Sequence, residues 1–220
     1  MNLYVLNNSN AKYAVVAGKV KSIRKGTGKA EGKVVNVTLT GTEWDKEAKD
    51  NKPTYIDIAF WNSDDGKQLA TRIEKAGIRE GEYIAALIFP PTDNKATGVD
   101  FTRSGHYWTI PQQDKKDLTV FVGTVASLDS YNDGNLTKVS VPVSFKDETT
   151  WYKINFWNNE EQALADRAKA CLAPKEGAEG EKQTYVKAVI VCGEKLTNEE
   201  RPDDPPSFTG FRFELFPQQK

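Results

Sequence analysis

Apolar and polar residues alternate along several short runs of the chain, and these runs are rich in valine, isoleucine and aromatic residues. A period of two is typical of β-strands that bury one face. Turn residues bound most of the runs, which favours strands over buried helical segments. The predicted strands cover residues 15–23, 33–40, 55–61, 83–89 and 99–110 in the first half, and 119–128, 138–145, 151–157, 185–192 and 208–216 in the second.

A different spacing follows the third predicted strand of each half. Apolar residues there recur every three or four positions, as they do on one face of an α-helix. These residues are Leu69, Ile73 and Ala76 in the first half, and Leu164, Ala168 and Leu172 in the second. Each half thus has the order of an oligonucleotide/oligosaccharide-binding (OB) barrel. The predicted fold is all-β, with two tandem five-stranded OB-fold barrels that each carry a helix between strands 3 and 4.

The two halves also repeat each other in sequence. Ile-Ala-Phe-Trp-Asn at residues 58–62 recurs as Ile-Asn-Phe-Trp-Asn at residues 154–158. Further matches join residues 17–20 to 122–125, 83–86 to 185–188, and 108–113 to 214–219, in the same order. Such ordered matches indicate a tandem repeat. The polar segment at residues 114–117 then predicts an OB-fold domain 1 at residues 1–113 and an OB-fold domain 2 at residues 114–220.

The charge and the reactive residues exclude several classes of function. The formal net charge is −1, so any nucleic-acid site must come from local clustering of cations. The two cysteines, Cys171 and Cys192, and the single histidine, His106, have no zinc-site spacing, so no metal or cofactor is expected. Two buried free thiols are the preferred interpretation of the cysteines, and a disulfide is the alternative. Without a nucleophile motif, neither an enzyme nor a small-molecule substrate is expected.

The beginning of the chain lacks the basic and apolar regions of a signal peptide. No apolar stretch approaches the roughly 20 residues that span a bilayer. We therefore expect a cytoplasmic protein that does not use a membrane.

The third predicted strand carries the residues that point most clearly to a ligand. Both halves have an aromatic residue at its start and a tryptophan six positions later, on the face opposite the apolar one. The candidates are Tyr55 and Trp61 in the first half, and Trp151, Lys153 and Trp157 in the second. Exposed aromatic area is unfavourable unless a partner covers it. A nucleobase is such a partner, since stacking contributes about 1–3 kcal/mol per base and tolerates any sequence. The alternative is that the tryptophans pack under a loop or against the other barrel.

A basic segment precedes the second predicted strand. Between residues 12 and 33 the only acid is Glu31, and the candidate DNA-binding cations are Lys19, Lys21, Arg24, Lys25, Lys29 and Lys33. Much of this segment is predicted to be a flexible, glycine-containing loop beside the aromatic face, which suits a phosphate backbone. A solvated loop without a ligand is the alternative. The corresponding residues 129–135 contain acids and no cation, so the first barrel has the better electrostatics and the second the better stacking face.

At these residues the chain resembles the bacterial single-stranded DNA-binding protein (SSB) family, in a tandem OB-fold form. The similar segments are Gly-Lys-Val at residues 18–20, Gly-Thr-Val at residues 123–125, the third strands and residues 78–84. The resemblance implies that the third-strand aromatics stack on DNA bases, that two chains form a homodimer with four barrels, and that the protein acts in DNA replication, repair and recombination. The family's acidic, apolar tail tip has no counterpart in the sequence, and Asp57 and Ala59 are poor choices for phosphate and base contacts.

The sequence thus predicts a protein that binds single-stranded DNA with low sequence specificity, through aromatic stacking and a basic loop. Two alternatives stay open. An OB fold can serve as a protein-interaction module without nucleic acid, and the near-neutral charge favours that function. Single-stranded RNA is the other, because stacking does not require a deoxyribose.

Overall fold

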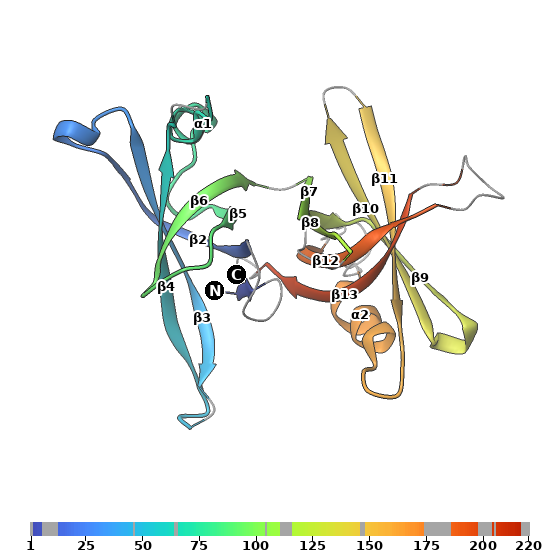
Figure 1. Cartoon of the computed structure of the whole chain (residues 1–220). Coiled ribbons are helices and arrows are strands. Elements are labelled where there is room, and N and C mark those ends of the chain that lie inside the picture. Colours follow the sequence, from blue (N-terminus) through green and yellow to red (C-terminus); the bar gives the residue numbers. More distant parts are fainter. Residues whose placement is uncertain are drawn as a thin grey trace, which may run out of the picture. The chain divides into compact units, whose positions relative to one another are not determined.

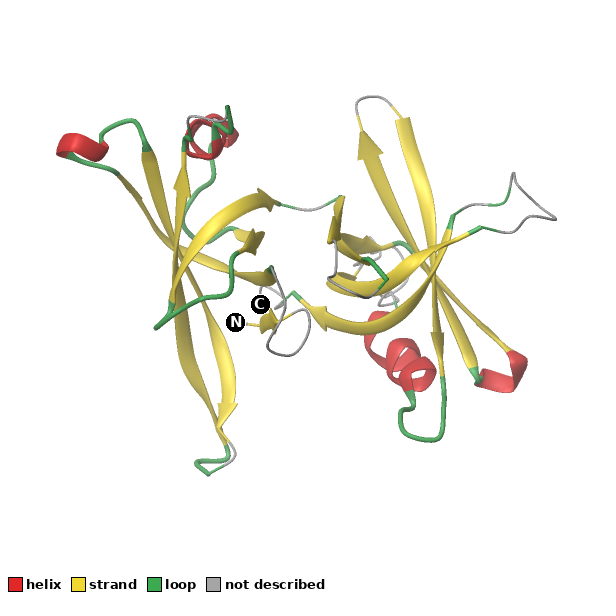
Figure 2. Ribbon diagram, in the orientation of Figure 1, coloured by secondary structure: helices red, strands yellow, loops and turns green. Residues whose placement is uncertain are grey.

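A computed structural model of the chain describes residues 2–5, 13–45, 47–63, 66–103, 105–110, 116–145, 148–173, 186–197, 204 and 206–216. The chain divides into two compact units, Met1–Arg103 and Ser104–Lys220. This division lies ten residues before the boundary drawn from the polar segment at residues 114–117. Both units are mostly β-structure, and one α-helix is described in each (Figures 1 and 2).

The first unit is a closed five-stranded barrel. Its strands are β2 (Ala14–Lys25), β3 (Val34–Asp45), β4 (Asp50–Trp61), β5 (Tyr83–Ile88) and β6 (Lys95–Thr102). They are hydrogen-bonded in the order β2-β3-β4-β6-β5, and β5 pairs again with β2, which closes the barrel. Helix α1 (Leu69–Ala76) lies between the third and fourth barrel strands, as predicted. A short strand, β1 (Asn2–Val5), pairs with β2.

The core of the first unit follows the alternation seen in the sequence. Ile56, Ile58 and Phe60 point inward from β4 and are at most 1% exposed. Leu69 and Ile73 cover this core from α1, which explains their helical spacing. The strands β3 and β4 continue beyond the barrel as a long hairpin, so they are longer than the alternation alone predicted (Figure 1).

The second unit contains the same order of elements, but its sheet is not closed. Its elements are β7 (His106–Ile110), β8 (Leu118–Val125), β9 (Ser127–Tyr131), β10 (Leu136–Phe145), β11 (Glu148–Trp157), α2 (Leu164–Leu172), β12 (Val186–Leu196) and β13 (Ser207–Leu215). The strand order is β7-β8-β12-β13-β11-β10-β9. Helix α2 stands where α1 stands in the first unit. The prediction of a second closed five-stranded barrel is therefore not met by the strand pairings that the structure describes.

The open sheet has a local cause at Ala126. The predicted first strand, residues 119–128, is interrupted there, so β8 pairs with β12 and β9 pairs with β10. The Ala126 amide donates to the Ser140 carbonyl at 2.9 Å, so the bend between β8 and β9 stays bonded to β10. In the first unit the matching position is Lys21, where a register shift leaves β2 continuous. A bulge of this kind bends a strand without ending it, which lets one strand pair on both sides.

Two further expectations are corrected at the junction of the units. The predicted strand at residues 99–110 is two strands, because β6 ends at Thr102 and β7 pairs with β8 of the second sheet. The sequence match of residues 108–113 with 214–219 therefore aligns β7 with the end of β13, and among the described residues these two strands hold different positions in their sheets. The true counterpart of β13 is β6, since both pair in parallel with the third barrel strand of their unit.

The cysteines are free, as the preferred interpretation held, but only one of them is buried. Cys192 is buried in β12, and burial raises the pKa of its thiol well above the ordinary value. Cys171 is exposed on α2, contrary to the expectation of two buried thiols. No helix among the described residues is long and apolar enough to span a membrane.

Candidate nucleic-acid interface

The outward face of β4 carries the aromatic residues predicted for the first unit. Tyr55 is 53% exposed and Trp61 is 43% exposed. Every second residue between them, Ile56, Ile58 and Phe60, is buried in the core. Asp57 and Ala59 lie between the two aromatic side chains on the same face, and both are partly exposed. The predicted orientation of this strand is therefore confirmed.

The outward face of β11 repeats this arrangement in the second unit. Trp151 is 48% exposed and Trp157 is 43% exposed, while Ile154 and Phe156 are fully buried. Lys153 and Asn155 lie between the tryptophans and are partly exposed. The side-chain Oδ1 of Asn155 is covered and has no hydrogen-bond partner among the residues that the structure describes.

Tyr152 lies on the side of β11 that carries Ile154 and Phe156, and it packs against the core of the second unit. Its side chain is only partly buried, and its ring lies 5.3 Å from that of Tyr107 and 5.2 Å from that of Phe121. Burial, and then a hydrogen bond and a charge interaction with Tyr107, raise the pKa of Tyr152 to about 12. Tyr152 thus belongs to an aromatic cluster at the margin of the core and not to the outward face.

The asparagine that follows each outward tryptophan has a structural role. Asn158 Oδ1 accepts the backbone amide of Ala165 at 2.8 Å, in the first turn of α2. Asn62 Oδ1 accepts the amide of Thr71 at 3.1 Å, in the first turn of α1. Asn158 Oδ1 also accepts the amide of Asp166, at 3.3 Å. Amides in the first helical turn lack intrahelical partners, so the asparagines satisfy them from outside the helix. The repeated Phe-Trp-Asn motif therefore combines a core residue, an exposed platform and a helix cap.

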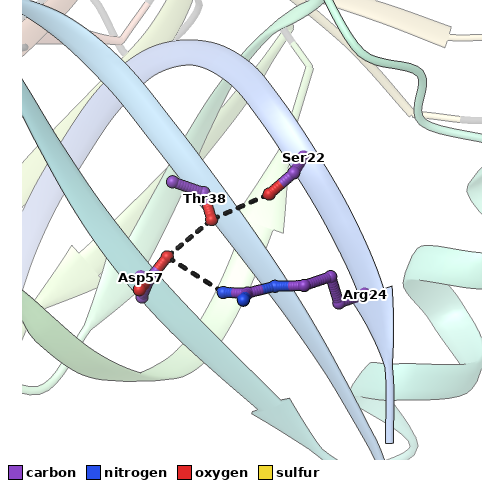
Figure 3. A network of polar contacts seen from close by, with 4 residues as sticks. All are labelled: Ser22, Arg24, Thr38 and Asp57. Carbon is purple, nitrogen blue, oxygen red and sulfur yellow. Dashed lines mark hydrogen bonds and ion pairs between the residues drawn. The ribbon is translucent and has the colours of Figure 1, made fainter.

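A chain of hydrogen bonds crosses the centre of the outward face of β4, which is called the first face below (Figure 3). Ser22 Oγ of β2 donates to Thr38 Oγ1 of β3 at 3.0 Å, and Thr38 Oγ1 donates to Asp57 Oδ1. Arg24 Nη2 also reaches Asp57 Oδ1, at 3.5 Å, and its side chain is 64% exposed. That separation is long for a hydrogen bond, so the guanidinium is held loosely.

The outward face of β11, called the second face below, has a matching chain of hydrogen bonds. This chain ends at a lysine, Lys153, and not at an aspartate. Lys153 Nζ donates to Ser140 Oγ at 2.6 Å, and Ser127 Oγ donates to the same oxygen at 2.8 Å. Ser127 and Ser140 are register partners, as Ser22 and Thr38 are in the first unit. A lysine therefore occupies the central position that an aspartate occupies in the first unit.

The predicted basic loop is mostly strand. Lys19, Lys21, Arg24 and Lys25 lie on β2, and only residues 26–33 connect it to β3. Within this connection Lys29 belongs to a 3₁₀ turn, η1 (Gly28–Ala30), and Lys33 directly precedes β3. Lys19 lies in the same row as Tyr55 on the outward face, because it pairs with Thr40, the partner of Tyr55, and Lys33 directly precedes Val34, the partner of Trp61. Lys25 instead lies in the row of the core residues Val35 and Phe60, so the structure does not bring it to the outward aromatic face.

The cations of the first unit differ in how far they are neutralised. Lys25 Nζ lies 3.1 Å from a carboxylate oxygen of Glu74, and Arg24 contacts Asp57. Lys19, Lys21, Lys29 and Lys33 make no ion pair with any residue that the structure describes. These four ammonium groups are therefore available to an anionic ligand.

Comparisons with known proteins give distant structural similarity. No protein family matches the sequence, and no curated protein matches it. A deletion mutant of the single-stranded DNA binding protein from Thermus aquaticus is 10% identical, with a TM-score of 0.31 over 94% of this chain and 95% of its own. The wild-type Thermus aquaticus protein is 10% identical, with a TM-score of 0.29 over 94% of both chains. The p204 HINb domain is also 10% identical, with a TM-score of 0.25 over 94% of this chain and 96% of its own.

Two residues of the second face, Tyr131 and Lys138, were not predicted from the sequence as candidate site residues. Tyr131 is 45% exposed at the end of β9, and Lys138 Nζ lies 4.7 Å from the centre of its ring. Tyr131 and Trp157 both pair with Leu136, so they lie in one row across the face. Only the pairing of β9 and β11 with β10 places these residues on the face, and the sequence of a single strand does not show that pairing. Among the described residues, no group of three or more histidine, cysteine or acidic side chains could hold a metal ion.

Proposed function

We propose that this protein binds single-stranded DNA without catalysing a reaction, and that it does so with low sequence specificity. The observation that carries this proposal is the repeated pair of exposed aromatic side chains, Tyr55 with Trp61 and Trp151 with Trp157. Each pair lies on one face of a strand whose other face is core. Because every nucleobase has an aromatic face, such platforms bind successive bases with little regard to sequence.

The surrounding cations supply the second requirement, which is neutralisation of phosphates. Lys19, Lys21, Lys29 and Lys33 lie on β2 or in its connection to β3, and none of them has an acidic partner among the described residues. Lys138 and Lys153 lie on the second face, where their partners are an aromatic ring and a hydroxyl. Cations without carboxylate partners release counterions when they contact phosphates, which favours binding at low salt.

A fluorescence titration with oligo-dT tests the proposal. Trp61, Trp151 and Trp157 are more than 40% exposed, so a base that stacks on them will quench their emission. We expect saturable quenching at low salt, weakened by added salt, together with a shift in a native gel. Oligo-rU of the same length, added as a competitor, compares RNA with DNA on the same sample. If saturating oligo-dT gives neither quenching nor a shift, the DNA proposal is wrong.

A protein-interaction module is the second candidate function. Asp57 at the centre of the first face favours it, because a carboxylate repels phosphates. The exposed aromatic pairs would then be covered by a protein partner instead of by bases. Full retention of tryptophan emission with oligo-dT would support this second candidate.

A further inference from the structure

Asp57 and Lys153 occupy matching positions in the two units. Asp57 pairs with Thr38 on one side and with Lys95 in parallel on the other, and Lys153 pairs with Ser140 and Ser207 in the same way. Each residue stands two positions after the first aromatic of its face and four before the tryptophan. The two faces therefore share one frame and differ in the charge at its centre.

The hydrogen bonds show that each charge is built into its face. In the first unit the hydroxyl of Thr38 donates a hydrogen bond to Asp57 and accepts one from the hydroxyl of Ser22. In the second unit the Ser140 oxygen accepts from both Lys153 and Ser127. The hydroxyl at the central row thus donates to the carboxylate in one unit and accepts from the ammonium in the other. Hydrogen bonds to a charged group are stronger than those between neutral groups, so they hold each charge in place.

Both central groups keep unused hydrogen-bonding capacity. The contacts of Asp57 with Thr38 and Arg24 all end on Oδ1, and Oδ2 has no partner among the residues that the structure describes. The Asp57 side chain is 32% exposed, so this oxygen can accept from a ligand. Lys153 has one described hydrogen bond and three ammonium hydrogens, which leaves two donors. The central residue of the first face therefore offers an acceptor, and the central residue of the second face offers donors.

The spacing puts these groups beside a stacked base. Successive residues of a strand are about 3.3 Å apart, so positions two residues apart on one face are separated by about 7 Å. A base that stacks on Tyr55 therefore extends toward Asp57, and one on Trp151 extends toward Lys153. Stacking contacts the flat face of the base and leaves its edge free. The central residue is thus the group that meets the base edge.

We propose that Asp57 and Lys153 give the two faces opposite base preferences, and this inference rests on the proposed function. The first face favours bases with an exocyclic amino group, because the carboxylate accepts its hydrogen. The second face favours bases with a carbonyl group at that edge, because the ammonium donates to it. Cytosine and uracil are the matched probes, since they share one ring size and differ at C4, which carries an amino donor or a carbonyl acceptor.

The test uses the full chain with one aromatic face removed at a time. Trp151→Ala/Trp157→Ala leaves only the first face, and Tyr55→Ala/Trp61→Ala leaves only the second. Binding of labelled oligo-dC and oligo-dU of equal length is measured by fluorescence anisotropy in mildly alkaline buffer, which keeps cytosine unprotonated. We expect the first variant to favour oligo-dC and the second to favour oligo-dU, each by about fivefold, the lower end of the range for one base contact.

Changes at the central residues then separate base recognition from simple charge. In the Trp151→Ala/Trp157→Ala variant, which keeps the first face, Asp57→Asn keeps the shape of the side chain and loses the preference for oligo-dC. Asp57→Lys in the same variant reverses the preference toward oligo-dU. In the Tyr55→Ala/Trp61→Ala variant, which keeps the second face, Lys153→Met loses the preference for oligo-dU, and Lys153→Asp reverses it toward oligo-dC. Thermal melts confirm that each variant is folded, and the near-isosteric Asp57→Asn remains informative if Asp57→Lys does not fold.

The outcomes distinguish this inference from the function on which it rests. If the wild-type chain binds neither oligonucleotide, the proposed function is wrong. If Asp57→Lys strengthens binding of oligo-dC and oligo-dU equally, Asp57 acts on phosphates and the base-edge inference alone fails. Equal affinities for both probes in both single-face variants would overturn it as well, with DNA binding intact.

Discussion

The ring of Phe156 lies directly over the backbone of Gly210, so closely that a Cβ at residue 210 would stand 2.7 Å from the ring Cζ. Phe60 covers Gly98 of the first unit in the same way. Both glycines belong to the strand that pairs in parallel with the third barrel strand, β13 or β6. This repeated contact identifies those two strands as equivalent more clearly than the sequence match of residues 108–113 with 214–219.

Gly210→Ala is expected to destabilise the second unit. Phe156 is fully buried, so its ring cannot move away from an added methyl group, and overpacking of this kind costs about 1–3 kcal/mol. Thermal unfolding measures the loss. Gly193→Ala is the matched control, because its Cβ would meet Phe211, which is 50% exposed and can turn aside. Equal melting temperatures for the two variants would contradict the packing argument.

Asn158→Ala is expected to lower stability through the end of α2. The change removes the acceptor for the amides of Ala165 and Asp166 and leaves both without their side-chain partner. Loss of a side chain that caps a helix costs about 1 kcal/mol. Denaturant titration of Asn158→Ala beside Asn135→Ala, which deletes an exposed turn asparagine, isolates the effect. A wild-type unfolding midpoint for Asn158→Ala would mean that water replaces the cap at no cost.

Alternation along single strands was enough to predict which residues face outward. Ile58 and Phe60 are buried and Trp61 is exposed because a strand turns successive side chains to opposite faces. The helices were also predictable, since Leu69 and Ile73 keep one face toward the core at every turn. These features depend on neighbouring residues, which the sequence displays directly.

Features that depend on pairing between distant strands could not be predicted. Ser22, Thr38 and Asp57 come together from three strands, and no one of these strands shows that Asp57 binds Arg24. Closure of the sheet depends on a single bend, at Lys21 or Ala126, whose outcome differs between the units. The break after Thr102 falls at Arg-Ser-Gly, residues 103–105, and the prediction ran one strand through this short polar segment because aromatic residues follow it in β7.

The lysines without acidic partners are expected to set the salt dependence of DNA binding. Lys21→Ala/Lys29→Ala/Lys33→Ala removes three exposed charges from β2 and its connection to β3. If each contacts one phosphate, the slope of log K against log salt becomes shallower by about 2. Lys75→Ala/Lys169→Ala/Lys187→Ala removes the same charge from other exposed positions and is the control. Equal slopes for the two variants would show that the basic segment is only solvated.

The Lys25→Ala change is expected to have a smaller effect than any of those three. Its ammonium group lies 3.1 Å from Glu74, so contact with a phosphate must compete with an existing ion pair. A side chain that is 72% exposed keeps such a pair weak, and the pair is easily exchanged. Isothermal titration of Lys25→Ala beside Lys21→Ala compares the two directly. A larger loss of affinity in Lys25→Ala would mean that the pair with Glu74 does not persist in solution.

The Trp151→Ala/Trp157→Ala chain is expected to remain folded and to bind oligo-dT more weakly. Both side chains leave the outward face of β11, at 48% and 43% exposure, and the core residues Ile154 and Phe156 are untouched. Truncating buried tryptophans costs about 3–5 kcal/mol each, which would abolish folding of the unit. Truncating stacking platforms instead costs about 1–3 kcal/mol of binding free energy each and spares stability. Thermal melts and anisotropy titrations on the same samples therefore separate the two roles. A large drop in melting temperature would show that another part of the protein covers this face, and wild-type affinity would place the bound strand on the first face alone.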